Sequence, residues 1–513
     1  MYRHAVRKTS HFSGSKGERM KIGFDNDKYI RMQSENIRKR IHEFGGKLYL
    51  EFGGKLFDDT HASRVLPGFM PDSKLKMLLQ LKDSAEIVIA VSADALDTSK
   101  TRGDSGITYD REVLRLIDMF RMVGLYVGSV VITRNSGYSK AVETLKATLE
   151  AHDIKVFKHY YINGYPQDIP LIISEEGFGK NDYIETTRPL VVITAPGPGS
   201  GKMATCLSQL YHEHKRGIQA GYAKFETFPV WNLPLNHPVN LAYEAATADL
   251  DDINMIDPFH YDAYEKTAVN YNRDVDVFPV LNAIFEKIQG TSPYKSPTDM
   301  GVNMVGFCIS DDEACRRAAK QEIIRRYCQA LCEHRKGNAP KEPAFKIELL
   351  MNKANISVSD RPVIMAANVR HEETGGPAAA MQMPDGTILT GRTTSLLGAS
   401  SALLLNALKY LANIPEEVKL LSPVMIEASQ NLMTNHLGEH NPLLHLNEIL
   451  LILAIAAVED ENAKKALDAL PLLAGLDAHS SVILSQIDEG VFKKLGVNQT
   501  CEANYESKKL YHR

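Results

Sequence analysis

The sequence contains no hydrophobic run long enough to cross a membrane, because its most apolar stretch, Ile449–Val458, is far shorter than the ~20 residues that a spanning helix needs. It is also poor in cysteine, with six in 513 residues, and these are spread along the chain rather than clustered as in a disulfide framework. A net charge of −4 gives no excess of positive charge to attract nucleic acid or a membrane surface. We therefore predict a cytoplasmic protein with free thiols and without nucleic-acid or membrane partners.

The chain is long enough for two or three domains. Residues 1–19 are basic and polar and lack the apolar core of a secretory signal, so we expect an upstream extension or a disordered arm there. The charged segment 335–343 contains glycine and prolines and is typical of a linker. We predict an N-terminal domain at residues 20–338 and a C-terminal domain at residues 339–513.

Short apolar segments alternate with helical patterns through the first half of the chain. The predicted strands are residues 47–52, 87–91, 127–133, 154–162, 190–194 and 219–225. This order is typical of an α/β domain with a mostly parallel, Rossmann-like or P-loop-like sheet that is flanked by helices. The last third is different, with a strand expected at 361–369, a hairpin at 381–390 and several helices, which predicts a separate mixed α+β domain.

The stretch 188–205 has the order strand, glycine-rich turn, lysine and helix. Glycines let backbone N–H groups approach an oxyanion, the helix N-terminus adds positive potential, and a lysine adds a full charge. The sequence therefore predicts a loop that binds phosphate, with candidate binding residues Gly197, Gly199, Ser200, Gly201, Lys202 and Thr205. Lys202 is also a candidate catalytic residue, because its ammonium group would neutralise charge on a transferred phosphoryl group.

This loop departs from the Walker A motif at two positions. Pro196 stands where the motif has glycine, and Met203 stands where it has the hydroxyl residue that holds Mg²⁺. Ser200 or Thr205 would have to replace that hydroxyl. Candidate carboxylates for Mg²⁺ are Asp94, Asp249 and Asp257. The alternative interpretation is a tight turn between strand and helix that binds no ligand.

Two further stretches carry candidate residues. Arg273 and Asp274 precede a predicted helix, and we assign them as candidate catalytic residues because a guanidinium group suits phosphate or carboxylate. The alternative for Asp274 is a helix N-cap. A second possible anion site begins the small-residue helix after the hairpin, and its candidate binding residues are Arg392, Thr393, Thr394 and Ser395. Ordinary capping by the hydroxyls is the alternative there.

Other polar groups admit two interpretations. The loop that follows the first strand contains Asp58, Asp59, His61 and Arg64, and it forms either a pocket wall or a solvated turn. The segment 436–440 matches the HxxEH pattern of some zinc hydrolases. Because Gly438 lies inside this pattern and Pro442 follows it, we expect a loop between helices and predict no metal site.

Several long stretches are specific enough to indicate a family: KIGFDNDKY at 21–29, LEFGGKLFDD at 50–59, ITAPGPGSGKMATCLSQLYHE at 193–213, YNRDVD at 271–276 and GRTTSLLGASSALLLNALK at 391–409. In these stretches the chain resembles a bacterial family of unknown function, domain of unknown function family 1846. The resemblance implies a large N-terminal α/β region followed by a separate C-terminal domain. It implies no particular reaction or substrate.

From the residues we expect a nucleotide-dependent transferase or ligase that acts on a small metabolite, with ATP or another nucleotide and Mg²⁺ as cofactors. A metal-independent enzyme that acts on a phosphorylated metabolite or a dinucleotide is the first alternative, and the missing hydroxyl at Met203 favours it. A nucleotide sensor or an oligomeric scaffold without catalytic activity is the second. The expected partner is a phosphorylated small molecule, and we expect a homo-oligomer.

Overall fold

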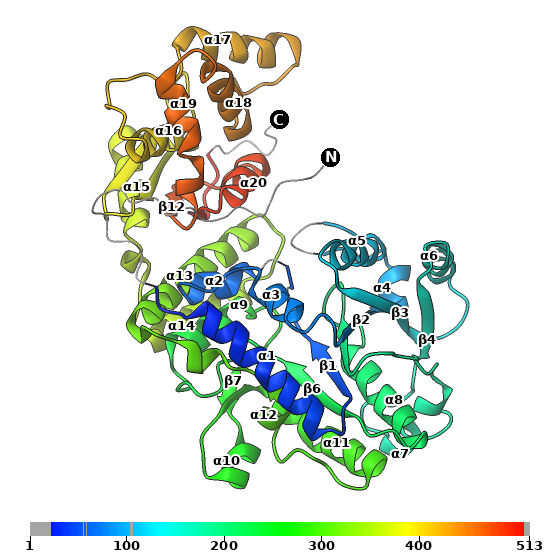
Figure 1. The fold of residues 1–513 in the computed structure, drawn as a ribbon. Coiled ribbons are helices and arrows are strands. Elements are labelled where there is room, and N and C mark those ends of the chain that lie inside the picture. The colour runs from blue at the N-terminus through cyan, green and yellow to red at the C-terminus, as the bar shows by residue number, and fades with distance from the viewer. Residues whose placement is uncertain (1–21, 55, 58, 103–105, 507–513) are drawn as a thin grey trace. The chain divides into compact units, whose positions relative to one another are not determined.

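The computed structural model describes residues 22–54, 56, 57, 59–102 and 106–506 (Figure 1). The chain divides into two compact units, residues 22–322 and the residues from Ile323 onward. The division lies within helix α13 (Asp312–Arg335). The predicted domain boundary between residues 338 and 339 falls in the turn between α13 and α14 and stays a prediction. The predicted extension at 1–19 lies outside the described residues.

The N-terminal unit is built on a seven-stranded parallel sheet with the order β4-β3-β2-β5-β1-β6-β9. Six of its strands match the predicted segments to within two residues at each end, because strands buried on both faces form nearly continuous apolar runs. The strands are β1 (Leu48–Phe52), β2 (Ala85–Ser92), β3 (Tyr126–Asn135), β4 (Lys155–Tyr160), β5 (Leu190–Thr194), β6 (Gly221–Phe225) and β9 (Gly301–Val302). The predicted Rossmann-like α/β architecture is confirmed.

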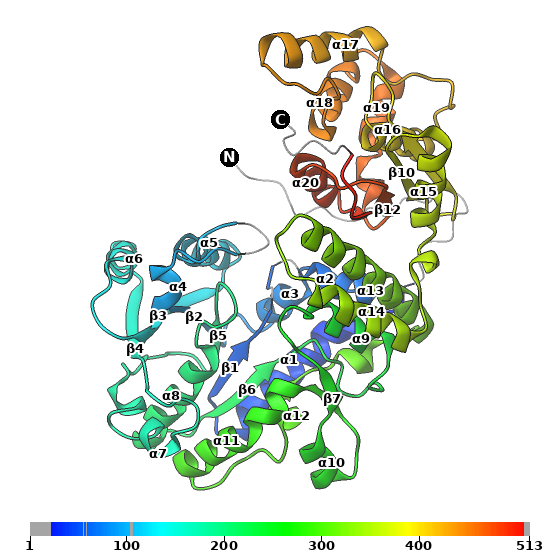
Figure 2. The same cartoon turned by 180° about the vertical axis from the view of Figure 1, so that it is seen from behind.

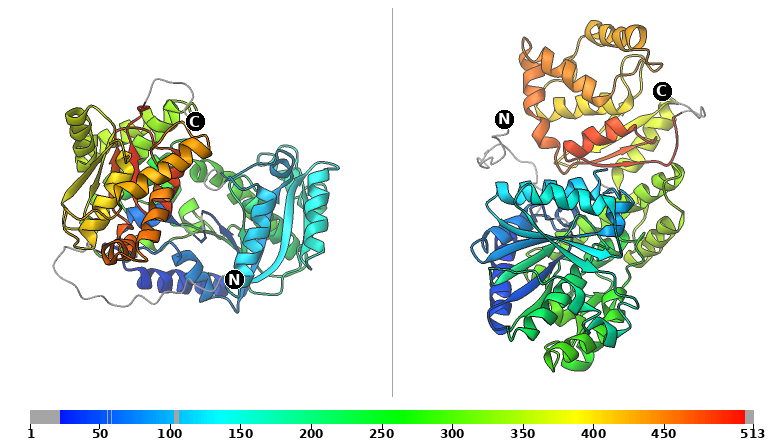
Figure 3. Two further views of the ribbon diagram at one scale, coloured as in Figure 1. Left: turned by 90° about the horizontal axis from the view of Figure 1, so that it is seen from above. Right: turned by 90° about the vertical axis from the view of Figure 1, so that its right-hand side faces the viewer.

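Helices cover both faces of this sheet (Figures 1 and 2; Figure 3, right). Alternate side chains of the strands, among them Tyr49, Val191 and Tyr222, pack against α8 and α11 in one buried core. Helices α5 and α6 lie on the opposite face from α8. The helices of this unit are α1 (Asn26–Glu43), α2 (Thr60–Val65), α3 (Ser73–Leu79), α4 (Ala93–Asp97), α5 (Tyr109–Met122), α6 (Lys140–Glu150), α7 (Ile169–Ile172), α8 (Lys202–Lys215), α9 (Pro238–Ala246), α10 (Pro258–Tyr264), α11 (Asn272–Gln289) and α12 (Pro297–Met300).

The segment between β6 and α11 is rich in polar and aromatic residues and folds into short elements. Besides α9 and α10 it contains a small antiparallel hairpin of β7 (Asn254–Ile256) and β8 (Val269–Tyr271). The hairpin delivers the chain to the start of α11 at Asn272. This connection therefore places the predicted residues Arg273 and Asp274 in the first turn of a helix.

The second unit contains a four-stranded mixed sheet with the order β11-β10-β12-β13, which confirms a separate α+β domain. Its strands are β10 (Ala378–Gln382), β11 (Ile388–Arg392), β12 (Asp477–Ser480) and β13 (Asn498–Cys501), and β10 and β11 form the predicted hairpin. Its helices are α14 (Glu342–Ala354), α15 (Pro362–Thr374), α16 (Ala399–Leu411), α17 (Pro423–Asn431), α18 (Leu446–Ala456), α19 (Glu461–Asp468) and α20 (Gln486–Lys494).

The prediction of a strand at 361–369 is wrong, because α15 occupies these residues. Pro362 is the first residue of the helix, where its missing N–H costs nothing. The apolar residues Val363, Ile364 and Ala367 are spaced so that they bury one face of a helix.

Candidate functional site

The topology of the large sheet marks one place at its carboxyl edge. From β2 the chain runs outward through β3 to β4 and then crosses back to β5, which lies on the other side of β2. In open α/β sheets, ligands bind outside the carboxyl ends of the strands at such a switch point. Because β2 and β5 are paired neighbours, the chain leaves both strands at this edge, and the loop after β5 is the glycine-rich turn.

The glycine-rich turn joins β5 to α8. Gly199 and Gly201 have φ of 78° and 81°, in the left-handed region that glycine adopts without strain. Lys202 is the first residue of α8. Pro198 and Gly199 are exposed, and a Cβ atom at Gly199 would meet nothing within 4 Å. Solvent therefore reaches the outer part of the turn.

Within the part of the chain that the structure describes, no group accepts a hydrogen bond from the N–H of Gly199, Ser200 or Gly201. These N–H groups precede the N-terminus of α8, whose dipole adds positive potential. The turn thus supplies the donors that an oxyanion needs.

Three buried hydroxyl groups donate hydrogen bonds to backbone carbonyl oxygens of the turn. Ser200 Oγ donates to the carbonyl oxygen of Gly197 at 2.9 Å, and Thr205 Oγ1 donates to that of Gly201 at 2.9 Å. Thr133 Oγ1 on β3 donates to the carbonyl oxygen of Ser200 at 2.9 Å. Ser200 and Thr205 are almost completely buried. The two hydroxyls that the sequence offers for Mg²⁺ therefore fix the shape of the loop.

A second group of polar residues lies at the carboxyl ends of β1 and β6. Lys224 on β6 contacts the Tyr271 hydroxyl and the Asp274 carboxylate, and its Nζ lies 3.2 Å from Glu226 Oε1. Glu51 on β1 is the register partner of Lys224 and accepts a hydrogen bond from the Tyr222 hydroxyl at 2.8 Å. We call Lys224, Glu226, Tyr271 and Asp274 the lysine cluster. It combines one ammonium, one phenol and two carboxyl groups in a site that is almost closed to water.

Burial and charge act in opposite directions in the lysine cluster. Burial lowers the pKa of Lys224, but the Asp274 carboxylate and its neighbours outweigh this effect and raise the pKa well above its usual value. Burial raises the pKa of Glu226 to about 7, although the Lys224 ammonium group opposes the shift. The cluster therefore holds one stable positive charge beside a carboxyl group that gains and loses its proton near neutral pH.

The buried thiol of Cys206 is influenced by charged groups from both the glycine-rich turn and the end of β1. Burial raises the pKa of Cys206, the Glu51 carboxylate raises it further, and the Lys202 ammonium group lowers it. Both charged groups thus act on the same side chain in the second turn of α8. The loop and the carboxyl end of β1 belong to one region of the unit.

The predicted residues Arg273 and Asp274 are neighbours but have different partners. Asp274 is buried in the lysine cluster. The Arg273 guanidinium lies 2.6 Å from Asp252 Oδ1, and its side chain is 58% exposed. Asp274 therefore shares a site with Lys224, whereas Arg273 forms an ion pair at the surface.

At the second possible anion site, just before α16, threonine hydroxyls already accept hydrogen bonds from nearby backbone N–H groups. Thr394 Oγ1 accepts from the N–H groups of Leu396 and Leu397, and Thr393 Oγ1 accepts from that of Ala399. Arg392, Thr394 and Ser395 are exposed. The geometry is that of side-chain capping, and anion binding there stays a prediction.

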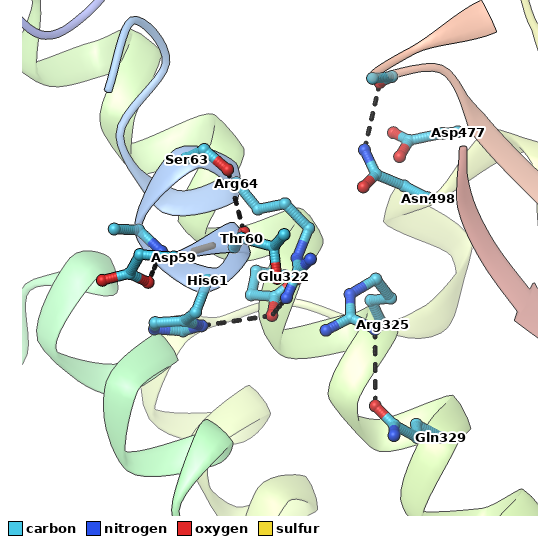
Figure 4. Close-up of polar contacts among 12 residues, drawn as sticks. Asp59, Thr60, His61, Ser63, Arg64, Glu322, Arg325, Gln329, Asp477 and Asn498 are labelled. Atoms are coloured by element: carbon cyan, nitrogen blue, oxygen red, sulfur yellow. Dashed lines mark hydrogen bonds and ion pairs between the residues drawn. The ribbon is translucent and has the colours of Figure 1, made fainter. Parts of the chain in front are cut away.

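The loop after β1 forms ion pairs within its own unit (Figure 4). Asp59 Oδ2 lies 2.8 Å from Lys74 Nζ. His61 Nδ1 and Arg64 Nε lie 3.3 Å and 2.8 Å from the buried carboxylate of Glu322. These contacts stabilise α2 on α13. Asp58 lies outside the described residues.

The described residues contain no group of three or more histidine, cysteine, aspartate or glutamate side chains arranged to hold a metal ion. Asp94 and Asp249 are exposed, and Asp257 caps α10. His436 ends a short π-helical turn, and Gly438 in the HxxEH segment has φ of 77°.

In the same described residues, no helix is both long and apolar enough to span a bilayer.

Sequence reasoning missed Lys224, Glu226 and Glu51, although the strands that carry them were predicted. The available signal was their position, since each is a charged residue at the carboxyl end of an apolar strand. Only the strand order shows that β1 and β6 are neighbours. Without the strand order, the sequence does not reveal that these charged residues lie close together.

Comparison with known proteins places the whole chain in one group. Residues 22–355 match the family model described as domain of unknown function DUF1846, N-terminal, and residues 359–511 match its C-terminal counterpart. A UPF0371 protein of Corynebacterium aurimucosum is 56% identical over 487 residues, which cover 95% of this chain and 98% of the relative. A UPF0371 protein of Streptococcus thermophilus is 55% identical over 493 residues, which cover 96% of this chain and all of the relative.

Proposed function

We propose a function from the geometry alone, because the chain belongs to the DUF1846 family, whose name states that its function is unknown. The protein is an enzyme that binds a phosphorylated small molecule at the glycine-rich turn and transfers a proton through the lysine cluster. The observation that carries the proposal is the exposed turn at the switch point, whose amide groups have no acceptor among the described residues.

The turn suits a phosphate group for three reasons. Its backbone N–H groups supply donors, the N-terminus of α8 supplies a partial positive charge, and Lys202 supplies a full one. Lys202 is partly buried, so its charge is less screened than that of a solvated lysine. A phosphoryl oxygen at Gly199 to Gly201 would face all three.

The lysine cluster suits acid–base chemistry. A carboxyl group with a pKa of about 7, such as Glu226, can both donate and accept a proton at neutral pH. The ammonium of Lys224 stabilises negative charge that develops beside it. Strands β5 and β6 flank β1, and neighbouring strands are about 4.8 Å apart, so their ends are about 10 Å apart, within the span of a small metabolite.

The hydroxyl contacts favour a metal-independent ligand over Mg²⁺-ATP. Both Ser200 and Thr205 are buried and donate to carbonyl groups of the loop. A hydroxyl ligand for Mg²⁺ would have to leave these positions. We therefore propose a phosphorylated metabolite or a dinucleotide as the ligand, and keep the ATP-dependent transferase or ligase as the second candidate, favoured by the position of Lys202 after the glycine-rich turn.

Calorimetry tests this proposal. The probes are ATP, NAD⁺, glucose 6-phosphate and inorganic phosphate, each with Mg²⁺ and with a chelator. We expect at least one probe to bind in chelator, and Lys202→Ala to weaken that binding about tenfold, in line with the loss of one charged hydrogen bond. Lys140→Ala is the matched control, since Lys140 is the exposed first residue of α6, and it should leave the affinity unchanged.

Each outcome separates the candidates. ATP binding that requires Mg²⁺ and is lost in Lys202→Ala would support the transferase or ligase. Equal affinity in the wild type and Lys202→Ala would place the ligand elsewhere and refute the proposal. Once a ligand is known, Glu226→Gln should retain its binding and lose turnover. A ligand that binds at the turn without any turnover would indicate a sensor.

A further inference from the structure

The second unit brings two cysteines together that are far apart in the sequence. Cys332 lies in the last turns of α13, and Cys501 is the last residue of β13. The Cys332 sulfur lies 3.4 Å from the carbonyl oxygen of Cys501, and each of the two side chains shifts the pKa of the other. All six cysteines are free thiols. Nothing in the proposed function uses this pair.

The surroundings of Cys501 favour its thiolate. Its sulfur accepts a hydrogen bond from Gln499 Nε2 at 3.9 Å. The neighbouring Cys332 thiol is the main cause that lowers the pKa of Cys501, against the effect of burial. The Cys501 side chain, together with burial, raises the pKa of Cys332. The two thiols are therefore different, and the thiolate forms on Cys501.

The solvent exposure of the two cysteines also differs. Cys501 is half-buried, whereas Cys332 is only 6% exposed. Cys332 lies beside it and is the residue with the smaller solvent-exposed area. This is the arrangement of an attacking thiol with a neighbouring resolving thiol.

We propose that Cys501 and Cys332 are an oxidation site, at which a peroxide converts the two thiols into a disulfide that ties the end of α13 to β13. The Cys501 thiolate attacks one peroxide oxygen and breaks the O–O bond, which leaves a sulfenic acid on Cys501 and releases water after protonation. The Cys332 sulfur then attacks the Cys501 sulfur and displaces the sulfenic oxygen as a second water. Two thiols are oxidised and one peroxide is reduced to two waters.

Peptide mapping of the full-length chain tests the site. The protein is treated with one equivalent of hydrogen peroxide, alkylated without reductant and digested with trypsin. We expect the peptide that contains Cys501 to be linked to the peptide 327–335. Because this second peptide contains both Cys328 and Cys332, the map is repeated with Cys328→Ser, in which the link should persist.

Two single variants test the roles of the thiols. In Cys332→Ser, dimedone should label Cys501 as a sulfenic acid, whereas in Cys501→Ser, Cys332 should be recovered as a free thiol. Cys206, which is completely buried in the other unit, serves as the internal control and should stay unmodified. Recovery of both Cys332 and Cys501 as free thiols after peroxide treatment of the wild type would overturn the proposal, as would a link from Cys501 to Cys328.

Discussion

Lys224 on β6 and Asp274 at the start of α11 form a buried ion pair between residues that are fifty positions apart. The pair joins a strand of the parallel sheet to the first turn of a helix on one of its faces. Tyr271 at the end of β8 and Glu226 directly after β6 complete the contacts of Lys224. A charge in this position is stable only while those partners remain.

Removal of the Asp274 charge should therefore destabilise the N-terminal unit. Asp274→Asn leaves the Lys224 ammonium with one fewer negative partner, and breaking a buried pair costs about 3–5 kcal/mol. Denaturation in urea measures the loss. Lys39→Ala is the control, because Lys39 and Glu43 form an exposed pair 3.6 Å apart that should contribute at most about 1 kcal/mol. Equal effects of the two variants would show that the Lys224 pair is not buried in solution.

Glu226 should make the free energy of unfolding of the protein depend on pH. Its pKa is about 7 in the folded protein and 4.5 in the reference state, so between these values the folded chain holds a proton that the unfolded chain has lost. Stability should then fall as the pH rises from about 5 to 8. Glu226→Gln removes this term, so the stability of the variant relative to the wild type should rise by about 1–3 kcal/mol between pH 5 and pH 8.

Urea denaturation at a series of pH values measures this difference. Glu313→Gln is the control, since the Glu313 side chain is 68% exposed and its removal should give a difference that is flat with pH. A flat difference for Glu226→Gln would mean that Glu226 titrates at the same pH in both states. That result would also remove the main support for its role as an acid–base group.

Alanine substitutions at the two left-handed glycines of the glycine-rich turn should destabilise the protein to different extents. Gly201→Ala places a Cβ 2.9 Å from Thr133 Oγ1 in addition to the left-handed strain, whereas the same change at Gly199 meets open space. The strain alone costs about 1–2 kcal/mol. Gly199→Ala should therefore lower Tm by a few degrees, and Gly201→Ala should lower it further. Equal shifts in Tm would show that Thr133 gives way without cost.

The sequence predicted the large sheet well because its strands are buried on both faces. Their apolar runs could be identified without knowledge of their neighbours, and the glycine turn before Lys202 was recognised from its local pattern alone. The lysine cluster could not be found in this way. Its members come from two strands and a helix start, and the strand order that unites them depends on long-range pairing. Asp274 was singled out, but its partner Lys224 was not.

The error at 361–369 has a local cause. Val363 and Ile364 suggested a strand, because β-branched residues are common there. The structure instead buries Val363, Ile364 and Ala367 on one face of α15, and it uses Arg361 as the residue before the helix. The buried contacts of Arg361 fix that helix start, and they involve strands that lie more than a hundred residues later.

Arg361 should accordingly be sensitive to replacement by lysine. Its guanidinium lies 3.0 Å from Asp477 Oδ1 and donates to the carbonyl oxygen of Asn498 at 2.6 Å, and its side chain is only 1% exposed. A lysine keeps the charge but cannot reach several acceptors as a planar fork does. Arg361→Lys should therefore destabilise the second unit by about 2–4 kcal/mol in urea, because buried acceptors lose their donors. Arg370→Lys on the neighbouring surface of α15 keeps a single exposed contact with Glu373 and should change stability by less than about 0.5 kcal/mol. If both variants were equally stable, the buried fork at Arg361 would not be what sets the start of α15.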